Sequence, residues 1–180
     1  MGQVKAYPPV KYICAITIAD MTLWEKVQVA LEDLLSPIDL TTDWFPFTYT
    51  DYYTPEMGRG LQKRFVAFQM LRPAEDLPGI KLATNHIEEI LSGTPQRRVN
   101  LDPGYVTAAR LVLATTKDYS HRVYLQKGIF GDVHLRFRNK RFEPMEWTYP
   151  DYREPFSLRF FEEVRSRYLV QLGEIGENVR

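Results

Sequence analysis

The chain opens with a pattern of apolar positions that predicts a strand followed by a helix. Residues 11–19 are almost all apolar and rich in β-branched side chains, which is typical of a strand buried on both faces and central in a sheet. Thr22 and Glu25 then have the spacing of a capping box. The apolar residues that follow at helical spacing predict a helix over residues 23–35.

Residues 38–101 continue the same alternation of strand and helix periods. Residues 38–47 and 61–71 predict two strands that pair as neighbours, with a turn-rich segment between them. A second helix is predicted to begin after Leu77-Pro78-Gly79 and to end at Gly93. Residues 97–101 predict a fourth strand.

This order of strand, helix, strand, strand, helix, strand predicts an α+β protein with a ferredoxin-like split βαβ core (βαββαβ). Residues 106–116 suit either a short helix or a strand, and we favour the helix. Residues 122–126 and 129–137 predict a C-terminal β-hairpin. An amphipathic stripe over residues 158–172 predicts a closing helix.

Composition indicates one globular domain over residues 1–180, with a loose lead-in at 1–9 and a frayed tail at 173–180. Lys plus Arg and Asp plus Glu number 23 each, so no overall field draws the molecule to nucleic acid or to an anionic membrane. We therefore expect no membrane partner, and nucleic acid is a disfavoured one. The chain has neither a membrane-spanning apolar run nor the pattern of a signal peptide, which favours a cytoplasmic location.

Several familiar chemistries are missing from the sequence. Cys14 is the only cysteine, so neither an internal disulfide nor a cysteine metal cluster is possible. His86, His121 and His134 do not have the spacing of metal ligands, and we expect no metal site. No phosphate-binding glycine loop, dinucleotide fingerprint or serine-hydrolase elbow is present, which leaves the cofactor, if one is used, unidentified.

Polar side chains concentrate between residues 97 and 122, beside segments that look like core. Asn100 and Asp102 share one face of the predicted strand and precede Pro103-Gly104, a pair that fits a type II turn. In one interpretation Asp102 caps local amides, which is the commoner role of Asp at turns. In the other, the carboxylate and the amide bind a metal ion or a substrate hydroxyl.

The segment 117–122 is a polar loop that enters a strand. His121 could act as a general base near neutral pH, and Arg122 could bind a phosphate or a carboxylate. Lys117 and Arg122 could equally pair with nearby carboxylates such as Asp102. Only convergence of these side chains in space would favour a site over a structural network.

Aromatic residues beside proline form a second kind of candidate. Trp147, Tyr149 and Asp151 lie in one such segment, and residues 51–58, which include Glu56, have a similar composition. Large aromatics at these positions either plug a loop onto the core or wall a pocket that stacks on a base or sugar.

Five segments together resemble the family catalogued as domain of unknown function 4416, a family of prokaryotic proteins. They are residues 55–58, 81–85, 100–105, 117–125 and 147–152. The resemblance covers nearly the whole chain and implies no catalytic residue. Some members carry an automatic GTP-binding label, but Thr116-Lys117-Asp118 lacks the spacer of the guanine-reading motif and the phosphate loop is missing.

We therefore expect a protein that binds a small molecule, such as a nucleotide or another small anion, and the sequence leaves open that it is an enzyme of unknown reaction. Asp102 and His121 are the candidate catalytic groups. The candidate ligand-binding residues are Lys81, Asn85, Asn100, Lys117, Arg122, Tyr105, Trp147, Tyr149, Asp151 and Glu56. The alternative is a non-enzymatic RNA- or protein-interaction module that uses the sheet of a ferredoxin-like core.

Overall fold

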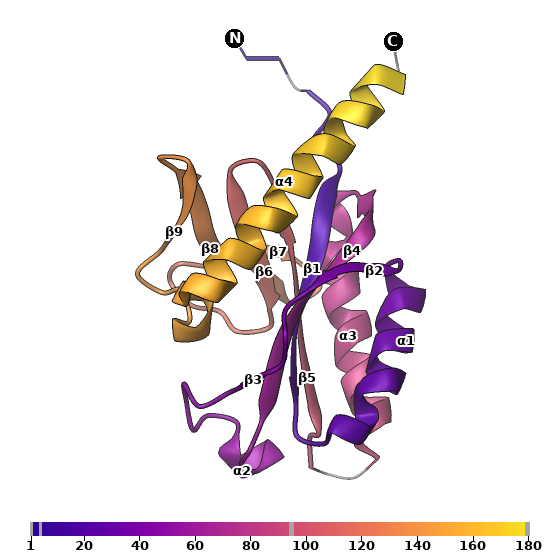
Figure 1. Cartoon of the computed structure of the whole chain (residues 1–180), viewed down its shortest axis with the longest axis vertical. Helices are drawn as coiled ribbons and strands as arrows, with labels where there is room; N and C mark the ends of the chain where they lie inside the picture. The colour runs from indigo at the N-terminus through magenta and orange to yellow at the C-terminus, as the bar shows by residue number, and fades with distance from the viewer. Residues whose placement is uncertain (1, 4, 94–95, 179–180) are drawn as a thin grey trace.

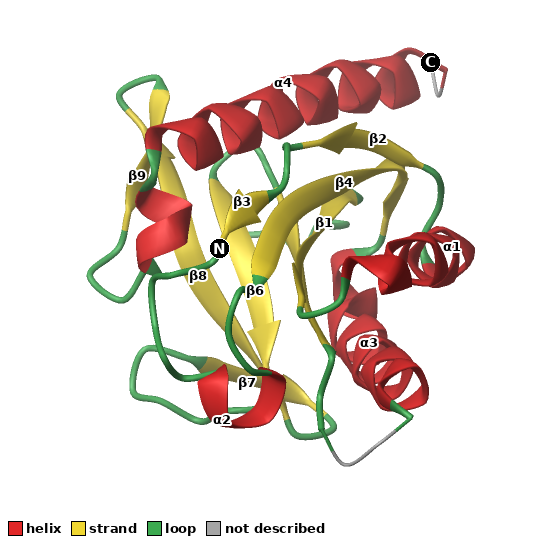
Figure 2. Ribbon diagram, turned by 60° about the horizontal axis from the view of Figure 1, so that its bottom comes forward, coloured by secondary structure: helices red, strands yellow, loops and turns green. Residues whose placement is uncertain are grey.

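The structure is a computed structural model that describes residues 2–3, 5–93 and 96–178. Within these residues a nine-stranded sheet, antiparallel throughout, is covered by helices on both faces (Figures 1 and 2). Two helices lie side by side on one face, and the long C-terminal helix crosses the other (Figure 2). No helix in this part of the chain combines the length and the apolar character needed to cross a bilayer.

The sheet has the strand order β2-β4-β1-β5-β6-β8-β7, with β3 beside β4 and β9 beside β8. The strands are β1 (Val10–Ile18), β2 (Ile38–Thr41), β3 (Phe45–Pro46), β4 (Gln62–Arg72), β5 (Val99–Val106), β6 (Arg110–Thr115), β7 (Val123–Gln126), β8 (Ile129–Arg138) and β9 (Arg141–Pro144). The helices are α1 (Trp24–Leu34), α2 (Thr54–Met57), α3 (Leu77–Ser92) and α4 (Pro155–Asn178). Short 3-10 turns are η1 (Met21–Leu23), η2 (Ala74–Asp76) and η3 (Pro150–Arg153).

Strand β1 divides the core into two layers, as its two-sided apolar sequence predicts. Cys14 and Ile16 belong to the cluster that packs against α1 and α3, whereas Ile13 and Ala15 belong to the cluster that packs against α4. The alternation follows from the period of two along a strand. The prediction of a fully buried central strand is confirmed, because β1 lies between β4 and β5.

The predicted ferredoxin-like split βαβ core with an added hairpin is wrong, although the α+β content is correct. β3 and α2 stand between β2 and β4, so the element order is not βαββαβ. The strands after β5 extend the same sheet to nine strands instead of decorating a four-stranded core.

The helix predicted over residues 106–116 is also wrong. They form the end of β5 and strand β6, where Leu111 and Leu113 face the α4 layer while Val112 and Ala114 face the opposite layer. Burial on both faces therefore outweighs the helical spacing of the apolar residues. The predicted type II turn at Pro103-Gly104 is also wrong, because β5 runs through both residues.

Most other predicted elements are present with shifted ends. The segment 38–47 is split into β2 and β3, and the helix predicted from residue 23 begins at Trp24 after η1. Asp20, instead of the predicted capping box, accepts the Thr22 amide at 2.9 Å. Helix α3 ends at Gly93, whose φ of 58° lies in the left-handed region, and the β7–β8 hairpin and the closing helix are confirmed.

Among the described residues, about half of strand β5 has no neighbouring strand on one edge. β6 pairs with β5 only at Gly104–Val106, so the backbone from Val99 to Pro103 is open on that side. Side chains take the place of a strand there. Glu88 accepts the Leu101 amide at 2.6 Å, and Lys81 donates to the Leu101 carbonyl at 2.8 Å. Both come from α3, which explains why these charged groups are buried.

Replacing Gly104 by Ala should destabilise the sheet, because an added Cβ would lie 2.3 Å from the Val112 carbonyl oxygen. Overpacking of this kind costs about 1–3 kcal/mol. The matched control is Gly79→Ala, where a Cβ meets nothing within 4 Å and which lies in helix α3. Thermal unfolding should show a lower midpoint for Gly104→Ala alone. Equal midpoints would mean that β5 and β6 separate easily.

Replacing Glu88 by Ala should also destabilise the fold, because it leaves the buried Leu101 amide and the Arg97 guanidinium without their carboxylate. We expect a loss of about 2–3 kcal/mol, the cost of an unsatisfied buried donor and a lost charged hydrogen bond. Glu89→Ala, at the next position of the same helix, is the control because that side chain is 77 % exposed. Urea unfolding of both variants measures the difference. Equal losses would contradict the edge-covering role of Glu88.

Candidate functional site

A pocket of about 430 Å³ opens beside the uncovered half of β5, on the face of the sheet that carries α4. Five segments supply its lining: the loop after β3, strands β4 and β5, the loop between β6 and β7, and the segment that enters η3. Its apolar wall consists of aromatic rings, namely Phe47, Tyr49, Tyr52, Tyr53, Tyr119 and Tyr149. Its charged lining residues are Lys63, Asp102, Lys117, Arg122 and Asp151.

The buried charges of the pocket begin with an ion pair between β4 and η3. The Lys63 ammonium lies 2.7 Å from the Asp151 carboxylate, and both side chains are at most 5 % exposed. The same ammonium lies over the Phe47 ring, 4.7 Å from its centroid. Aromatic rings and a carboxylate together stabilise a cation that has lost its water. Lys63 is therefore a fixed part of the pocket.

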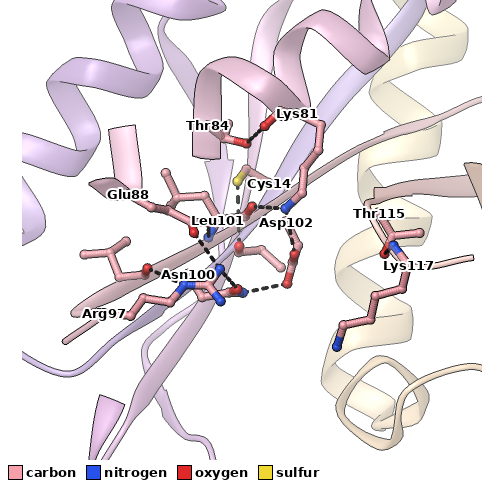
Figure 3. Close-up of polar contacts among 12 residues, drawn as sticks. Cys14, Lys81, Thr84, Glu88, Arg97, Asn100, Leu101, Asp102, Thr115 and Lys117 are labelled. Carbon is pink, nitrogen blue, oxygen red and sulfur yellow. Dashed lines mark hydrogen bonds and ion pairs between the residues drawn. The ribbon is translucent and has the colours of Figure 1, made fainter. Parts of the chain in front are cut away.

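Asp102 is held in the pocket wall by residues from α3 and from its own strand (Figure 3). Its carboxylate accepts hydrogen bonds from Lys81 at 3.1 Å and from the Asn100 amide at 2.6 Å. Burial alone would raise the pKa of Asp102, but Lys81, Lys63 and the bond from Asn100 outweigh it and hold that pKa below its usual value. Asp102 is thus an ionised acceptor at neutral pH.

The Asn100 side chain is itself fixed. Its carbonyl oxygen accepts a hydrogen bond from Arg97, and the Arg97 guanidinium lies 2.5 Å from the Glu88 carboxylate. The chain of contacts therefore runs from α3 through Arg97 and Asn100 to Asp102, and it positions the carboxylate (Figure 3).

The entrance of the pocket carries two cations with different surroundings. Arg122, whose side chain is 3 % exposed, lies 3.2 Å from the Asp132 carboxylate and donates to the Tyr149 hydroxyl at 3.2 Å. Lys117 is exposed and donates to the Tyr52 hydroxyl at 2.7 Å. Among the described residues no carboxylate forms an ion pair with Lys117, and in Figure 3 it lies apart from the Asp102 network.

The Tyr149 wall is attached to β8 through a buried histidine. The Tyr149 amide donates to His134 Nε2 at 3.0 Å, and the two rings lie 4.5 Å apart. Trp147 Nε1 donates to the Val133 carbonyl at 2.9 Å, which fixes the start of the same segment. The position of this wall thus depends on β8.

The structure gathers part of the set predicted from the sequence. Five of those residues line the pocket: Asp102, Lys117, Arg122, Tyr149 and Asp151. Lys81 and Asn100 lie behind Asp102 and contact it.

The other predicted residues lie elsewhere. His121 stacks on Trp147 with the ring centroids 4.8 Å apart, and both line a neighbouring open hollow. Tyr105 packs against Tyr12 on the opposite face of the sheet. Glu56 is exposed on α2, 3.7 Å from Arg97, and Asn85 is a half-buried residue of α3 that is not in the pocket lining.

Sequence reasoning missed Lys63, whereas the aromatic segments 51–58 and 147–152, which it named as a possible pocket wall, supply Tyr52, Tyr53 and Tyr149. A signal for Lys63 exists, because it alternates with Leu61, Phe65 and Ala67 and so occupies a core position of its strand. Phe47, Tyr49 and Tyr119 were not predicted as wall residues, because they come from loops that meet only in the folded chain. Asp132 and His134 alternate with apolar residues in the predicted hairpin, a pattern typical of an exposed face, yet both are buried. Within the described residues no group of three or more His, Cys, Asp or Glu side chains could hold a metal ion.

Comparison with known proteins gives one match. The model of the family described as Domain of unknown function (DUF4416) matches residues 8–168. No curated protein and no solved structure matched the chain. Since the match covers most of the 180 residues, the chain belongs to the DUF4416 family.

Proposed function

We propose that the tyrosine-walled pocket binds a small organic anion that carries a flat ring. The observation that supports this most directly is Lys117, an exposed cation in the pocket lining that contacts a phenol and has no ion-pair partner among the described residues. A ligand carboxylate or phosphate would complete its surroundings.

The charge balance of the lining supports an anion over a cation. Lys63 is paired with Asp151, Asp102 with Lys81 and Arg122 with Asp132. Lys117 adds one positive charge to these neutral pairs, so the pocket favours an added negative charge. A cationic ligand would be repelled by Lys63 and Lys81.

The aromatic wall and Asp102 define the rest of the ligand. Offset or edge-on contact with phenol rings favours a flat aromatic or heteroaromatic group over a flexible chain. Asp102 keeps free lone pairs although both of its oxygens accept a hydrogen bond, so it can accept one from a ligand hydroxyl, amide or ring N–H. A volume of about 430 Å³ suits a ring with one acidic substituent or a nucleoside monophosphate.

Asp102 and His121 do not act on one ligand in this proposal. His121 lines the neighbouring hollow with Trp147, whereas Asp102 lines the pocket. We therefore assign Asp102 to ligand orientation and give His121 no part in binding.

A thermal-shift screen should detect binding, because a ligand that prefers the folded state raises the unfolding midpoint. We expect 4-hydroxybenzoate and adenosine monophosphate to raise it. Adenosine, which lacks the anionic group, and inorganic phosphate, which lacks the ring, should each raise the midpoint less. At 100 times its Kd a ligand adds about 2.7 kcal/mol, or roughly 5–11 °C for a chain of this size. Equal shifts by adenosine and its monophosphate would contradict the anion requirement, and no shift by any of the four would contradict the proposal.

Lys117→Met should weaken the affinity for the anionic probes roughly 5- to 10-fold, because it removes a charge-assisted contact worth about 1 kcal/mol or slightly more at an exposed position. Lys26→Met is the matched control, since Lys26 is an exposed residue of α1 outside the pocket. Calorimetric titration of both variants measures the change. The wild-type affinity should also fall with added salt, and this salt dependence should be smaller in Lys117→Met. Unchanged affinity in Lys117→Met would remove the basis for the anion assignment.

A further inference from the structure

One wall of the pocket is hydrogen-bonded to a buried histidine. His134 is completely buried in β8, and its Nε2 accepts the amide of Tyr149, which lines the pocket. A nitrogen that accepts a hydrogen bond carries no proton, so the ring is neutral with its proton on Nδ1. Nδ1 lies 3.5 Å from the Asp132 carboxylate.

We propose that His134 is a positioning residue whose neutral ring holds Tyr149 in place, and that protonation of this ring releases the Tyr149 wall and weakens ligand binding. The ligand part of this inference rests on the proposed function of the pocket. The part that concerns Tyr149 stands on the hydrogen bond alone.

The chemistry of the contact explains the release. A proton added at Nε2 would face the Tyr149 N–H, so two donors would meet where one donor and one acceptor now pair. The His134 ring is completely buried, and an unpaired buried donor costs about 1–3 kcal/mol. Tyr149 can relieve this cost by moving away from the His134 ring, because it is 41 % exposed, while Trp147 and Thr148 keep the preceding residues on β8.

Movement of Tyr149 would also change the entrance of the pocket. The Tyr149 hydroxyl accepts a hydrogen bond from Arg122. If Tyr149 moved, Arg122 would lose this contact and the aromatic wall would lose one ring. Both effects reduce the affinity for an anion with a flat ring.

The charged and titratable groups around His134 come from three elements. Asp132 on β8 and Asp151 on η3 favour the protonated ring, whereas Lys63 on β4 opposes it. Tyr149 and Tyr152 contribute rings, with centroids 4.5 Å and 4.9 Å from that of His134. Asp132 is shared with Arg122 at 3.2 Å and with His121 at 3.4 Å.

Burial is the largest of these influences and lowers the pKa of His134 below its usual value. The unfolded ring takes its proton near pH 6.5, which is above the pKa in the folded state. Stability supplied by the neutral ring is therefore present above about pH 6.5 and is lost as the pH falls through the folded pKa. The release of Tyr149 should accordingly occur on the acidic side of neutrality.

The first test needs no ligand. In the full chain, NMR follows the His134 ring and the hydrogen-exchange protection of the Tyr149 amide between pH 8 and pH 5. We expect protection to fall at least tenfold together with protonation of the ring, while amides of the β1–β4 pairing stay protected. Protection that persists after His134 has been protonated would overturn the positioning role. Protection that is unchanged because the ring stays neutral down to pH 5 would overturn the switch.

The second test measures binding of 4-hydroxybenzoate, whose carboxylate stays largely ionised over this range. The wild-type affinity should weaken at least fivefold between pH 7 and pH 5. In His134→Gln, where an amide oxygen can accept the Tyr149 N–H without titrating, it should stay nearly constant. His121→Gln is the control, because His121 also contacts Asp132 but does not contact the Tyr149 amide. It should keep the wild-type pH profile.

The outcomes separate the two proposals. Binding that is independent of pH in the wild type, or that depends on pH equally in His134→Gln, would overturn the inference while the proposed function stands. Absence of binding by every probe at every pH would overturn the proposed function, and the ligand-free measurement would then decide the role of His134. If His134→Gln fails to fold, the wild-type ring and amide titrations still decide it.

Discussion

The incomplete pairing of β5 with β6 is the constraint on which the rest of the site depends. A strand with an open edge in a protein interior must find donors and acceptors other than a neighbouring strand. Helix α3 supplies them through Glu88, which accepts the Leu101 N–H, and Lys81, which donates to the Leu101 carbonyl. The same Lys81 holds Asp102, so the device that completes the sheet also fixes a carboxylate in the wall of the pocket.

Elements that depend on interactions between residues close in the sequence were predicted, whereas those that depend on distant residues were not. The elements β1, α3 and the β7–β8 hairpin depend on local period and turn residues, and these were predicted. Strand β6 depends on burial of both its faces by distant elements, so a helical spacing of apolar residues misled the prediction. The prediction of a ferredoxin-like core failed because strand order and sheet size depend on contacts between distant segments, which local patterns do not show.

The candidate site shows the same division. Asp102, Lys117 and Arg122 stand out in the sequence because they are polar groups beside apolar segments, and all three line the pocket. His121 stands out for the same reason, yet it lies outside the pocket against Trp147. Lys63 is hidden in a strand, and its partner Asp151 follows about ninety residues later. Only the register of β4 and the entry of η3 bring these two charges together.

Arg122 links the entrance of the pocket to its interior. Its guanidinium contacts Asp132, which faces His134, and also the Tyr149 hydroxyl, while the Tyr149 amide contacts His134. These contacts close a ring of four residues in which a change at one contact must be accommodated by the others. Lys117 lies outside the ring and carries no such constraint. The pocket thus combines Arg122, which is held in place and sets the shape of the entrance, with Lys117, whose ammonium can adjust to a ligand. An anion can therefore be gained at Lys117 without disturbing the buried charges, whereas any change in the His134 contact must reach the entrance.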